Sequence, residues 1–427
     1  MVQRSFLGDM LTTLFERRST PAGQGDPRSL EDMCLALLDA EGEVSGITLA
    51  QAILDRYAAL DADEKRAFYG FLNDDLEIDI SALRDAVDQF DASRSASDYR
   101  SLAHSAEPRR QELLRRLNQP PGATRALVAM RTDLLAALRQ QPELSRTDLD
   151  FRHLLRSWFN RGFLVLRQIS WETPASILEK IVEYEAVHAI QDWDDLRRRL
   201  YPKDRRCFAY FHPTMPDEPL IFVEVALTMS VPDSIQHVLA GDRVQRAPHD
   251  TKVAVFYSIS NCQQGLKGIS FGNLLIKQVV DELRQELPGL ETFVTLSPIP
   301  RFNAWLSEQS DDDVARTILQ GIAQPDDIRQ KAAAYLATAR RADGAPFDPV
   351  ARFHLGNGAQ IYAVHADADL SEKGRTQSSG AMVNYHYDMA LLEQNHERFV
   401  QNGEVSMTDA FRATLSKQIG KTQRMSA

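Results

Sequence analysis

The stretch from Lys252 to Phe302 constrains the fold more than any other part of this chain. Its first β-rich run, from Val253 to Ser258, predicts a strand. Apolar residues then recur at helical spacing, at Leu274, Leu275, Ile276, Val279, Val280 and Leu283. Pro288 and Gly289 end that helix, and residues 293–296 predict a second strand. This succession indicates a domain in which strands and helices alternate.

A glycine-rich turn separates the first strand from the helix and contains Gly265, Gly268 and Gly272. The start of a helix offers free backbone N–H groups and the positive end of the helix dipole, which suit a phosphate or pyrophosphate. Lys267 adds a positive charge. The spacing is neither GxxxxGK[ST] nor GxGxxG, so a tight connection without a ligand stays an open alternative.

Ser297 follows the second predicted strand and is flanked by Pro298 and Pro300. Groups at the carboxyl ends of strands in α/β domains commonly contact ligands. The prolines fix the backbone just beyond the serine. A serine that only caps the strand or begins a turn is the alternative.

A second unusual stretch runs from Ala351 to Tyr387. It places His354 just before an Asn357–Gly358 turn and ends in the sequence NYHY. The turn is able to hold the imidazole rigidly. A lone histidine is more often structural, and a buried core position explains Tyr387 equally well.

These two stretches, FYSISNCQQGLKGIS…LSPIP and FHLGNGA…NYHY, resemble malonyl-CoA decarboxylases. The similarity extends to Trp171–Leu227 and, more loosely, to the helical N-terminal part. It implies a helical N-terminal domain followed by a catalytic domain of the GNAT acyltransferase fold, with a mixed sheet. It also implies a homo-oligomer, a tetramer built as a dimer of dimers, to which the helical domain contributes contacts.

The resemblance implies conversion of malonyl-CoA to acetyl-CoA and CO2, in malonate and fatty acid metabolism. The thioester carbonyl of malonyl-CoA accepts the electrons released with CO2, so an enolate forms without metal, biotin, pyridoxal or thiamine. The serine of LSPIP, Ser297, is expected to bond the carboxylate or the enolate without covalent attachment. His354 is expected to protonate the enolate carbon, and Tyr387 to donate to the carboxylate or the histidine.

The same resemblance implies residues that bind CoA, and the list combines strand-end polar residues with the glycine turn: Ser258, Ser260, Asn261, Gln264, Gly265, Lys267, Gly268 and Gly272. Ordinary strand-end residues are the alternative for the two serines and the asparagine. The chain departs from many relatives at Arg301, where they have glycine. An arginine there reaches a carboxylate or phosphate, or points to solvent.

Two other functions remain open. The first is a CoA-dependent acyltransferase, because the GNAT fold mostly serves that reaction and a fold does not determine a function. It requires an acceptor amine or alcohol. The second is a non-catalytic acyl-CoA sensor, which predicts tight CoA binding without turnover.

The chain's length of 427 residues predicts more than one domain. We expect a helical domain at residues 1–162, for assembly and stability, and a catalytic domain at 163–427. Periodic apolar residues predict a bundle, with helices at 48–60, 63–73, 79–91, 108–117, 123–140 and 147–159. A further helical insertion is expected at 311–340.

Composition excludes several partners. The net charge of −11 argues against a nucleic-acid partner, and the arginines at 197–199 and 205–206 are expected on solvated faces. No apolar run reaches the length of a membrane span. The three cysteines share no metal spacing, which predicts reduced thiols, although two arginines before Cys207 suggest a lowered thiol pKa. Neither a signal peptide nor an SKL-type ending is visible, so we expect a cytoplasmic, bacterial protein.

Overall fold

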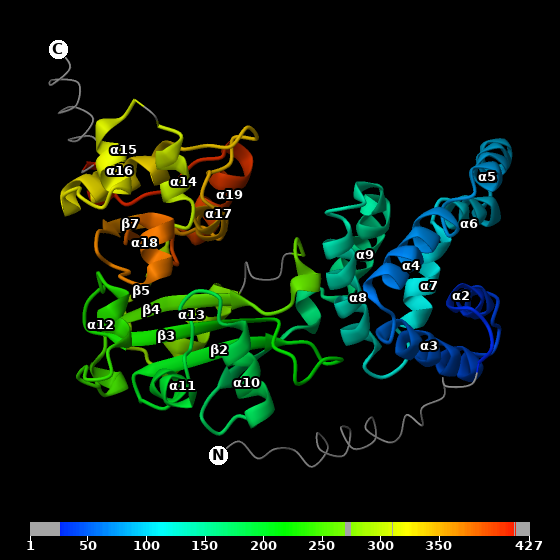
Figure 1. Ribbon diagram of the computed structural model, residues 1–427, viewed down its shortest axis with the longest axis horizontal. Coiled ribbons are helices and arrows are strands. Elements are labelled where there is room, and N and C mark those ends of the chain that lie inside the picture. Colours follow the sequence, from blue (N-terminus) through cyan, green and yellow to red (C-terminus); the bar gives the residue numbers. More distant parts are fainter. Residues whose placement is uncertain (1–25, 270–274, 310, 414, 416–427) are drawn as a thin grey trace. The chain divides into compact units, whose positions relative to one another are not determined.

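The computed structural model describes residues 26–269, 275–309, 311–413 and 415 (Figure 1). The chain forms two compact units. The helical unit contains the described residues up to Leu164 together with His212–Pro216 and 263–269. The sheet unit contains Val165–Phe211, Asp217–Cys262 and the described residues from 275 onward. The predicted division placed everything after residue 162 in one domain, whereas two later segments group here with the helical residues.

The helical unit contains α2 (Leu30–Leu38), α3 (Glu43–Ala58), α4 (Ala62–Asp74), α5 (Ile80–Ser93), α6 (Ala96–Ser105), α7 (Arg109–Leu117), α8 (Ala123–Ala137) and α9 (Ser145–Trp158). Polar side chains begin several of them. Asp61, for example, accepts the backbone N–H of Glu64, whose side chain accepts the N–H of Asp61 in return. The core consists of the apolar stripes of α2 to α4 and α7 to α9, including Leu37, Leu72, Leu113 and Leu127.

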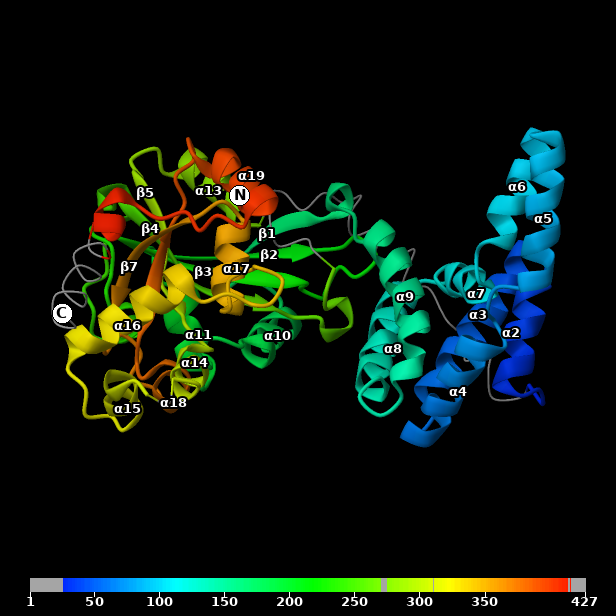
Figure 2. The same cartoon turned by 90° about the horizontal axis from the view of Figure 1, so that it is seen from above.

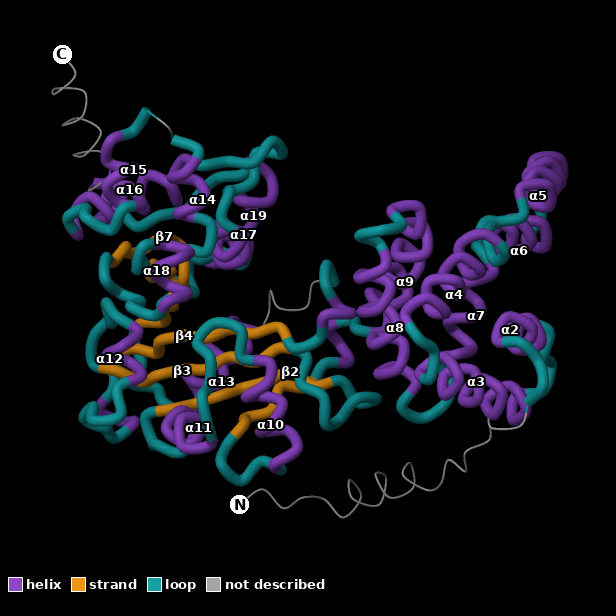
Figure 3. The backbone as a smooth tube through the Cα atoms, viewed as in Figure 1, coloured by secondary structure: helices purple, strands orange, loops and turns teal. Residues whose placement is uncertain are grey.

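The sheet unit contains β1 (Val165–Ile169), β2 (Arg205–Phe211), β3 (Ile221–Thr228), β4 (Val253–Asn261), β5 (Thr292–Thr295), β6 (Ser297–Pro298), β7 (Gln360–His365) and β8 (Met382–His386). They form one sheet in the order β1-β2-β3-β4-β5-β8-β6, with β7 paired to β8. Figure 3 shows these strands in orange, all within this unit. The predicted fold class, a helical region followed by a mixed sheet domain, is confirmed.

The pairing of β4 with β5 is parallel, whereas the other named pairs are antiparallel. Parallel neighbours need a crossover, and α13 (Leu275–Glu286) lies on it. The face of α13 that we predicted to be apolar is buried, from Leu275 to Leu283. Gly272 and Leu274 belong to the segment 270–274, which lies outside the described residues.

Helices cover both faces of the sheet (Figure 2). On one face, α10 (Ala175–Tyr184) and α11 (Trp193–Leu200) pack against Ala209, Phe211 and Phe222. On the other face, Gln278 of α13 accepts a hydrogen bond from the hydroxyl of Tyr210. The remaining helices are α12 (Ile235–Leu239), α14 (Phe302–Ser307), α15 (Asp313–Leu319), α16 (Pro325–Thr338), α17 (Pro349–Gly356), α18 (Glu372–Ser378) and α19 (Leu392–Asn402).

Two arginines contradict the expectation that the basic clusters lie on solvated faces. Arg199 and Arg205 are 3% and 4% exposed. Arg199 donates to the carbonyl of His188 at 2.8 Å and to the carboxylate of Glu224 at 3.2 Å. Arg205 donates to the carbonyl of Val238 at 2.5 Å. Their buried positions are stable because these partners satisfy the guanidinium groups.

Candidate functional site

Ser297 lies where the parallel pairing of β4 and β5 ends. The last paired residues are Phe256 and Thr295, and the N–H of Leu296 still donates to the carbonyl of Phe256 at 3.0 Å. The chain then leaves β4, and Ser297 pairs with Val383 of β8 instead. Ser297 is 5% exposed and therefore sits inside the sheet unit, at the end of a strand.

His354 lies on the last turn of α17 and is 3% exposed. The helix ends at the predicted Asn-Gly turn, where Gly358 has a φ of +82°. A Cβ atom there would meet the carbonyl oxygen of Leu392 at 2.1 Å, so only glycine fits. The ring of Tyr385 stacks on the imidazole with 4.6 Å between centroids. Helix end, turn and stack together fix the orientation of the ring.

Ser297, His354 and Tyr387 form a continuous chain of hydrogen bonds. The Oγ atom of Ser297 lies 3.1 Å from Nε2 of His354, and the hydroxyl of Tyr387 lies 2.8 Å from Nδ1. Tyr387 is held in turn by its backbone N–H, which donates to the carbonyl of Phe293 at 2.8 Å. The structure thus brings together all three residues that were predicted to be catalytic.

Burial determines the protonation states of His354 and Tyr387. Burial lowers the pKa of His354 to about 3, so its imidazole is neutral at neutral pH. Burial also raises the pKa of the Tyr387 hydroxyl well above its ordinary value, so the phenol keeps its proton. A neutral imidazole between two hydroxyls has one N–H to donate and one nitrogen to accept. The arrangement is suited to moving a proton.

Two residues that the sequence reasoning missed support this chain. Thr295 is fully buried, and its hydroxyl accepts a hydrogen bond from Ser297 at 2.8 Å. Asp348 caps α17 by accepting the N–H groups of Val350 and Ala351, and it also accepts the N–H of Arg301 at 3.2 Å. Asp348 therefore connects the segment after Ser297 to the helix that carries His354.

The guanidinium of Arg301 lies over the ring of Phe347, 5.7 Å from its centroid. The side chain is exposed, and its cation–π contact accounts for its position. Arg301 therefore lies at the start of α14, in the segment that follows Ser297.

Ser258 and Ser260 are buried on β4 and bond Glu185, which directly follows α10. The hydroxyl of Ser258 donates to the two carboxylate oxygens at 2.8 and 2.7 Å, and that of Ser260 at 3.3 Å. The same carboxylate accepts the backbone N–H groups of Val187 and His188. Glu185 thus fixes both serines, whereas Asn261 at the end of β4 is exposed.

The glycine turn packs on α8 of the helical unit. A Cβ atom on Gly265 would lie 1.9 Å from the carbonyl oxygen of Val128, so close backbone approach explains this glycine. Arg131 donates to the carbonyls of Gly265 and Lys267 at 2.5 and 2.9 Å. The side chains of Gln264 and Lys267 are exposed, and Gly268 has a φ of +79°. The assignment of these residues to CoA stays a prediction.

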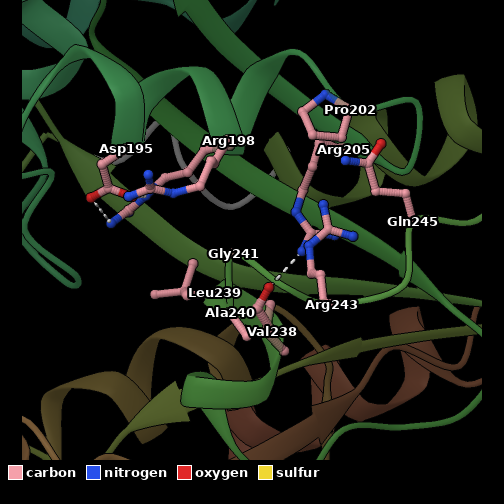
Figure 4. A pocket seen from close by; sticks show the side chains of 11 residues that line it. Asp195, Arg198, Pro202, Arg205, Val238, Leu239, Ala240, Gly241, Arg243 and Gln245 are labelled. Atoms are coloured by element: carbon pink, nitrogen blue, oxygen red, sulfur yellow. Dashed lines mark hydrogen bonds and ion pairs between the residues drawn. The ribbon is translucent and has the colours of Figure 1, made fainter.

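A small arginine-rich pocket of about 30 Å³ lies elsewhere in the sheet unit (Figure 4). Its arginines already have protein partners. Arg198 lies 3.5 Å from a carboxylate oxygen of Asp195, and Arg243 bonds both carboxylate oxygens of Asp204. The residues that line it include none of the predicted catalytic or CoA-binding side chains.

The suggestion that Cys207 has a lowered pKa is wrong. Its side chain is fully buried in the core beneath α10 and α11, and burial raises the pKa of the thiol well above its ordinary value. The carboxylates of Glu224 and Glu185 act in the same direction. Cys34, Cys207 and Cys262 are all free and buried.

The described residues contain no group of three or more His, Cys, Asp or Glu side chains arranged to hold a metal ion. No helix among them combines the length and apolar character needed to cross a membrane.

Solved structures of similar proteins cover nearly the whole chain. Malonyl-CoA decarboxylase from Rhodopseudomonas palustris is 48% identical with a TM-score of 0.84, covering 91% of this chain and 100% of that one. The protein of that name from Agrobacterium vitis is 47% identical with a TM-score of 0.85, covering 90% and 99%. The fold described above is therefore shared with these two proteins.

Sequence comparisons agree. Mitochondrial malonyl-CoA decarboxylase from Rattus norvegicus is 34% identical over 330 residues, which is 67% of each chain. The goose protein of that name, from Anser anser anser, is 31% identical over 73% of this chain and 70% of its own. The malonyl-CoA decarboxylase N-terminal domain family matches residues 76–159, and the C-terminal domain family matches 162–325 and 322–425. The chain therefore belongs to the malonyl-CoA decarboxylase family, a family of carboxy-lyases.

Proposed function

We propose that this protein converts malonyl-CoA to acetyl-CoA and CO2 without a metal or an organic cofactor. The buried hydrogen-bonded chain of Ser297, His354 and Tyr387 carries the proposal. It supplies hydroxyl donors and a neutral imidazole at the end of a strand, which is the chemistry that an enolate needs. Membership of the family supports the choice of substrate.

Decarboxylation breaks the bond between the α-carbon and the carboxylate carbon. The electron pair moves into the thioester carbonyl, CO2 leaves, and an enolate remains. The α-carbon then takes a proton to give acetyl-CoA. Preorganised donors at the developing negative charge are worth about 2.7–4 kcal/mol each in enzymes of this general kind.

In this mechanism the Ser297 hydroxyl, which donates to Thr295 in the structure, turns its proton to the carboxylate or to the enolate oxygen when malonyl-CoA is bound. His354 delivers the proton of Nε2 to the α-carbon, while Tyr387 passes its own proton to Nδ1. After acetyl-CoA leaves, a proton from water returns to Nε2 and Nδ1 passes its proton back to Tyr387, which restores the starting tautomer. A neutral imidazole with a lowered pKa is able to act as an electrophilic donor, and the imidazole of His354 is of this kind.

The direct test follows the products. The protein is incubated with malonyl-CoA in D2O, and CO2 release and acyl-CoA masses are measured. The proposal predicts stoichiometric CO2 and acetyl-CoA that carries one deuterium in its methyl group. Transfer of the malonyl group to an added amine or alcohol, without CO2, would instead identify an acyltransferase. Tight malonyl-CoA binding without turnover would identify a sensor.

Three finer points belong to the same proposal. The place of the reaction in malonate and fatty acid metabolism, which the resemblance implies, stays a prediction. The homo-oligomer expected from the sequence stays a prediction that light scattering on the purified protein tests. A cytoplasmic location also stays a prediction, since the goose and rat relatives are named mitochondrial, whereas the solved relatives named above come from bacteria.

A further inference from the structure

Thr295 occupies the last position of β5 and is fully buried. Its hydroxyl oxygen has two donors. The backbone N–H of Tyr385, on β8, donates to it at 3.1 Å, and the hydroxyl of Ser297 donates at 2.8 Å. The geometry of the second bond makes Ser297 the donor. Thr295 therefore receives the only proton that the Ser297 hydroxyl has.

The hydrogen bond from Ser297 to Thr295 determines whether Ser297 is a donor or an acceptor toward His354. Its Oγ atom lies 3.1 Å from Nε2, and its proton points at Thr295, so it faces Nε2 with a lone pair. Nε2 must then carry the imidazole proton and donate it. Because a neutral imidazole has a single N–H, Nδ1 is the acceptor and takes the hydroxyl hydrogen bond of Tyr387, at 2.8 Å.

We propose that Thr295 is a positioning residue that keeps His354 in the tautomer protonated at Nε2. It acts through Ser297, whose proton it accepts. The four side chains then form one directed chain, in which Tyr387 donates to His354, His354 to Ser297, and Ser297 to Thr295. The backbone N–H of Tyr385 fixes the end of this chain, because it occupies a second lone pair of Thr295.

The neutral state of the imidazole agrees with this direction, since burial lowers the pKa of His354 to about 3. The tautomer matters for the proposed decarboxylation, on which the catalytic consequence rests. A proton on Nε2 stands beside Ser297, ready for transfer. With the proton on Nδ1, Nε2 would be an acceptor and His354 would be unable to protonate the α-carbon.

The test is an ¹⁵N NMR measurement on the full-length protein labelled at the histidine ring nitrogens, with His354→Gln identifying the signals of His354. In the unsubstituted protein, Nε2 should give a protonated, pyrrole-type signal and Nδ1 an unprotonated, pyridine-type signal. Thr295→Val keeps the shape and removes the acceptor, so the Ser297 proton should turn to Nε2 and the two signals should exchange types. Thr295→Ser restores a hydroxyl and should restore the original pattern.

Kinetics give a second readout. Thr295→Val should lower kcat for malonyl-CoA at least about tenfold with KM little changed, and Thr295→Ser should recover most of it. A pyrrole-type Nδ1 in the unsubstituted protein, or an unchanged tautomer in Thr295→Val, would overturn the proposal. The spectrum of the unsubstituted protein alone shows which ring nitrogen of His354 is protonated, even if Thr295→Val does not fold. A protein that shows the expected tautomers but releases no CO2 would retain the positioning role and reject the proposed function instead.

Discussion

The Oγ atom of Ser297 and Nε2 of His354 lie 3.1 Å apart although 57 positions separate the two residues in the sequence. Ser297 begins β6, and His354 lies on the last turn of α17. Asp348 connects them, because one carboxylate oxygen caps α17 and the other accepts the N–H of Arg301. The short distance between Ser297 and His354 therefore depends on the buried carboxylate of Asp348, which is not itself hydrogen-bonded to either side chain.

Asp348→Ala should lower both stability and activity. Loss of a helix N-cap costs about 0.5–2 kcal/mol. Leaving the partly buried N–H of Arg301 without its acceptor adds up to about 1 kcal/mol. Because α17 and the segment after Ser297 lose their common anchor, kcat should fall as well. Urea denaturation and steady-state kinetics measure the two effects.

The matched control is Asp79→Ala, which removes an N-cap in the helical unit whose carboxylate accepts the N–H groups of Ser81 and Ala82. It should cost about 1 kcal/mol of stability and leave kcat unchanged. Equal kinetic effects of the two substitutions would contradict the positioning role of Asp348.

Gly265→Ala should destabilise the helical unit. The added Cβ atom would lie 1.9 Å from the carbonyl oxygen of Val128, and backbone atoms must move to accommodate it. Overpacking of this kind costs about 1–3 kcal/mol or more. Gly289→Ala is the control, because no heavy atom lies within 4 Å of its added Cβ. Urea midpoints that shift equally in both variants would show that the turn does not pack on α8 as described.

Stability should decrease on mild acidification because of buried histidines. The pKa of His354 falls from 6.5 to about 3 on folding, and that of His188 falls from 6.5 to about 4. Between pH 6.5 and the folded pKa of each histidine, the unfolded protein binds a proton there that the folded protein does not bind. The free energy of unfolding contributed by each group is therefore complete above pH 6.5 and is lost as the pH falls toward its folded pKa.

Chemical denaturation between pH 7 and pH 5 measures this dependence. His354→Gln should show a shallower loss of stability than the unsubstituted protein over this range. His249→Gln, at an exposed side chain, should follow the unsubstituted protein. An identical slope in His354→Gln would mean that folding does not lower the pKa of His354.

The sequence predicted the parts of the site that carry recognisable side chains in long motifs. Ser297, His354 and Tyr387 were found in this way, and the Asn-Gly turn after His354 was expected. Thr295 and Asp348 were missed for a physical reason. A threonine in a strand has ordinary β-propensity, and an aspartate before Pro349 is an ordinary helix cap, so neither shows what it contacts in the folded chain.

Long-range partners explain the other differences. The buried place of Arg199 depends on Glu224, 25 positions away on β3. Gly265 was assigned to a ligand, yet its immediate neighbour is the backbone of α8, which spacing alone does not show. Helix α6 was not predicted because it buries none of its residues, so it lacks the apolar stripe from which helices are recognised.

The most direct test of the account is kcat for malonyl-CoA decarboxylation in folded Ser297→Ala, His354→Ala and the double variant. If the two side chains act as one unit, each single substitution should lower kcat by about 10²-fold or more, with a much smaller effect on CoA binding. The double variant should then be little worse than the poorer single variant. Near-normal kcat in a folded His354→Ala protein would contradict the role of His354 as the proton donor, and with it the proposed mechanism of decarboxylation.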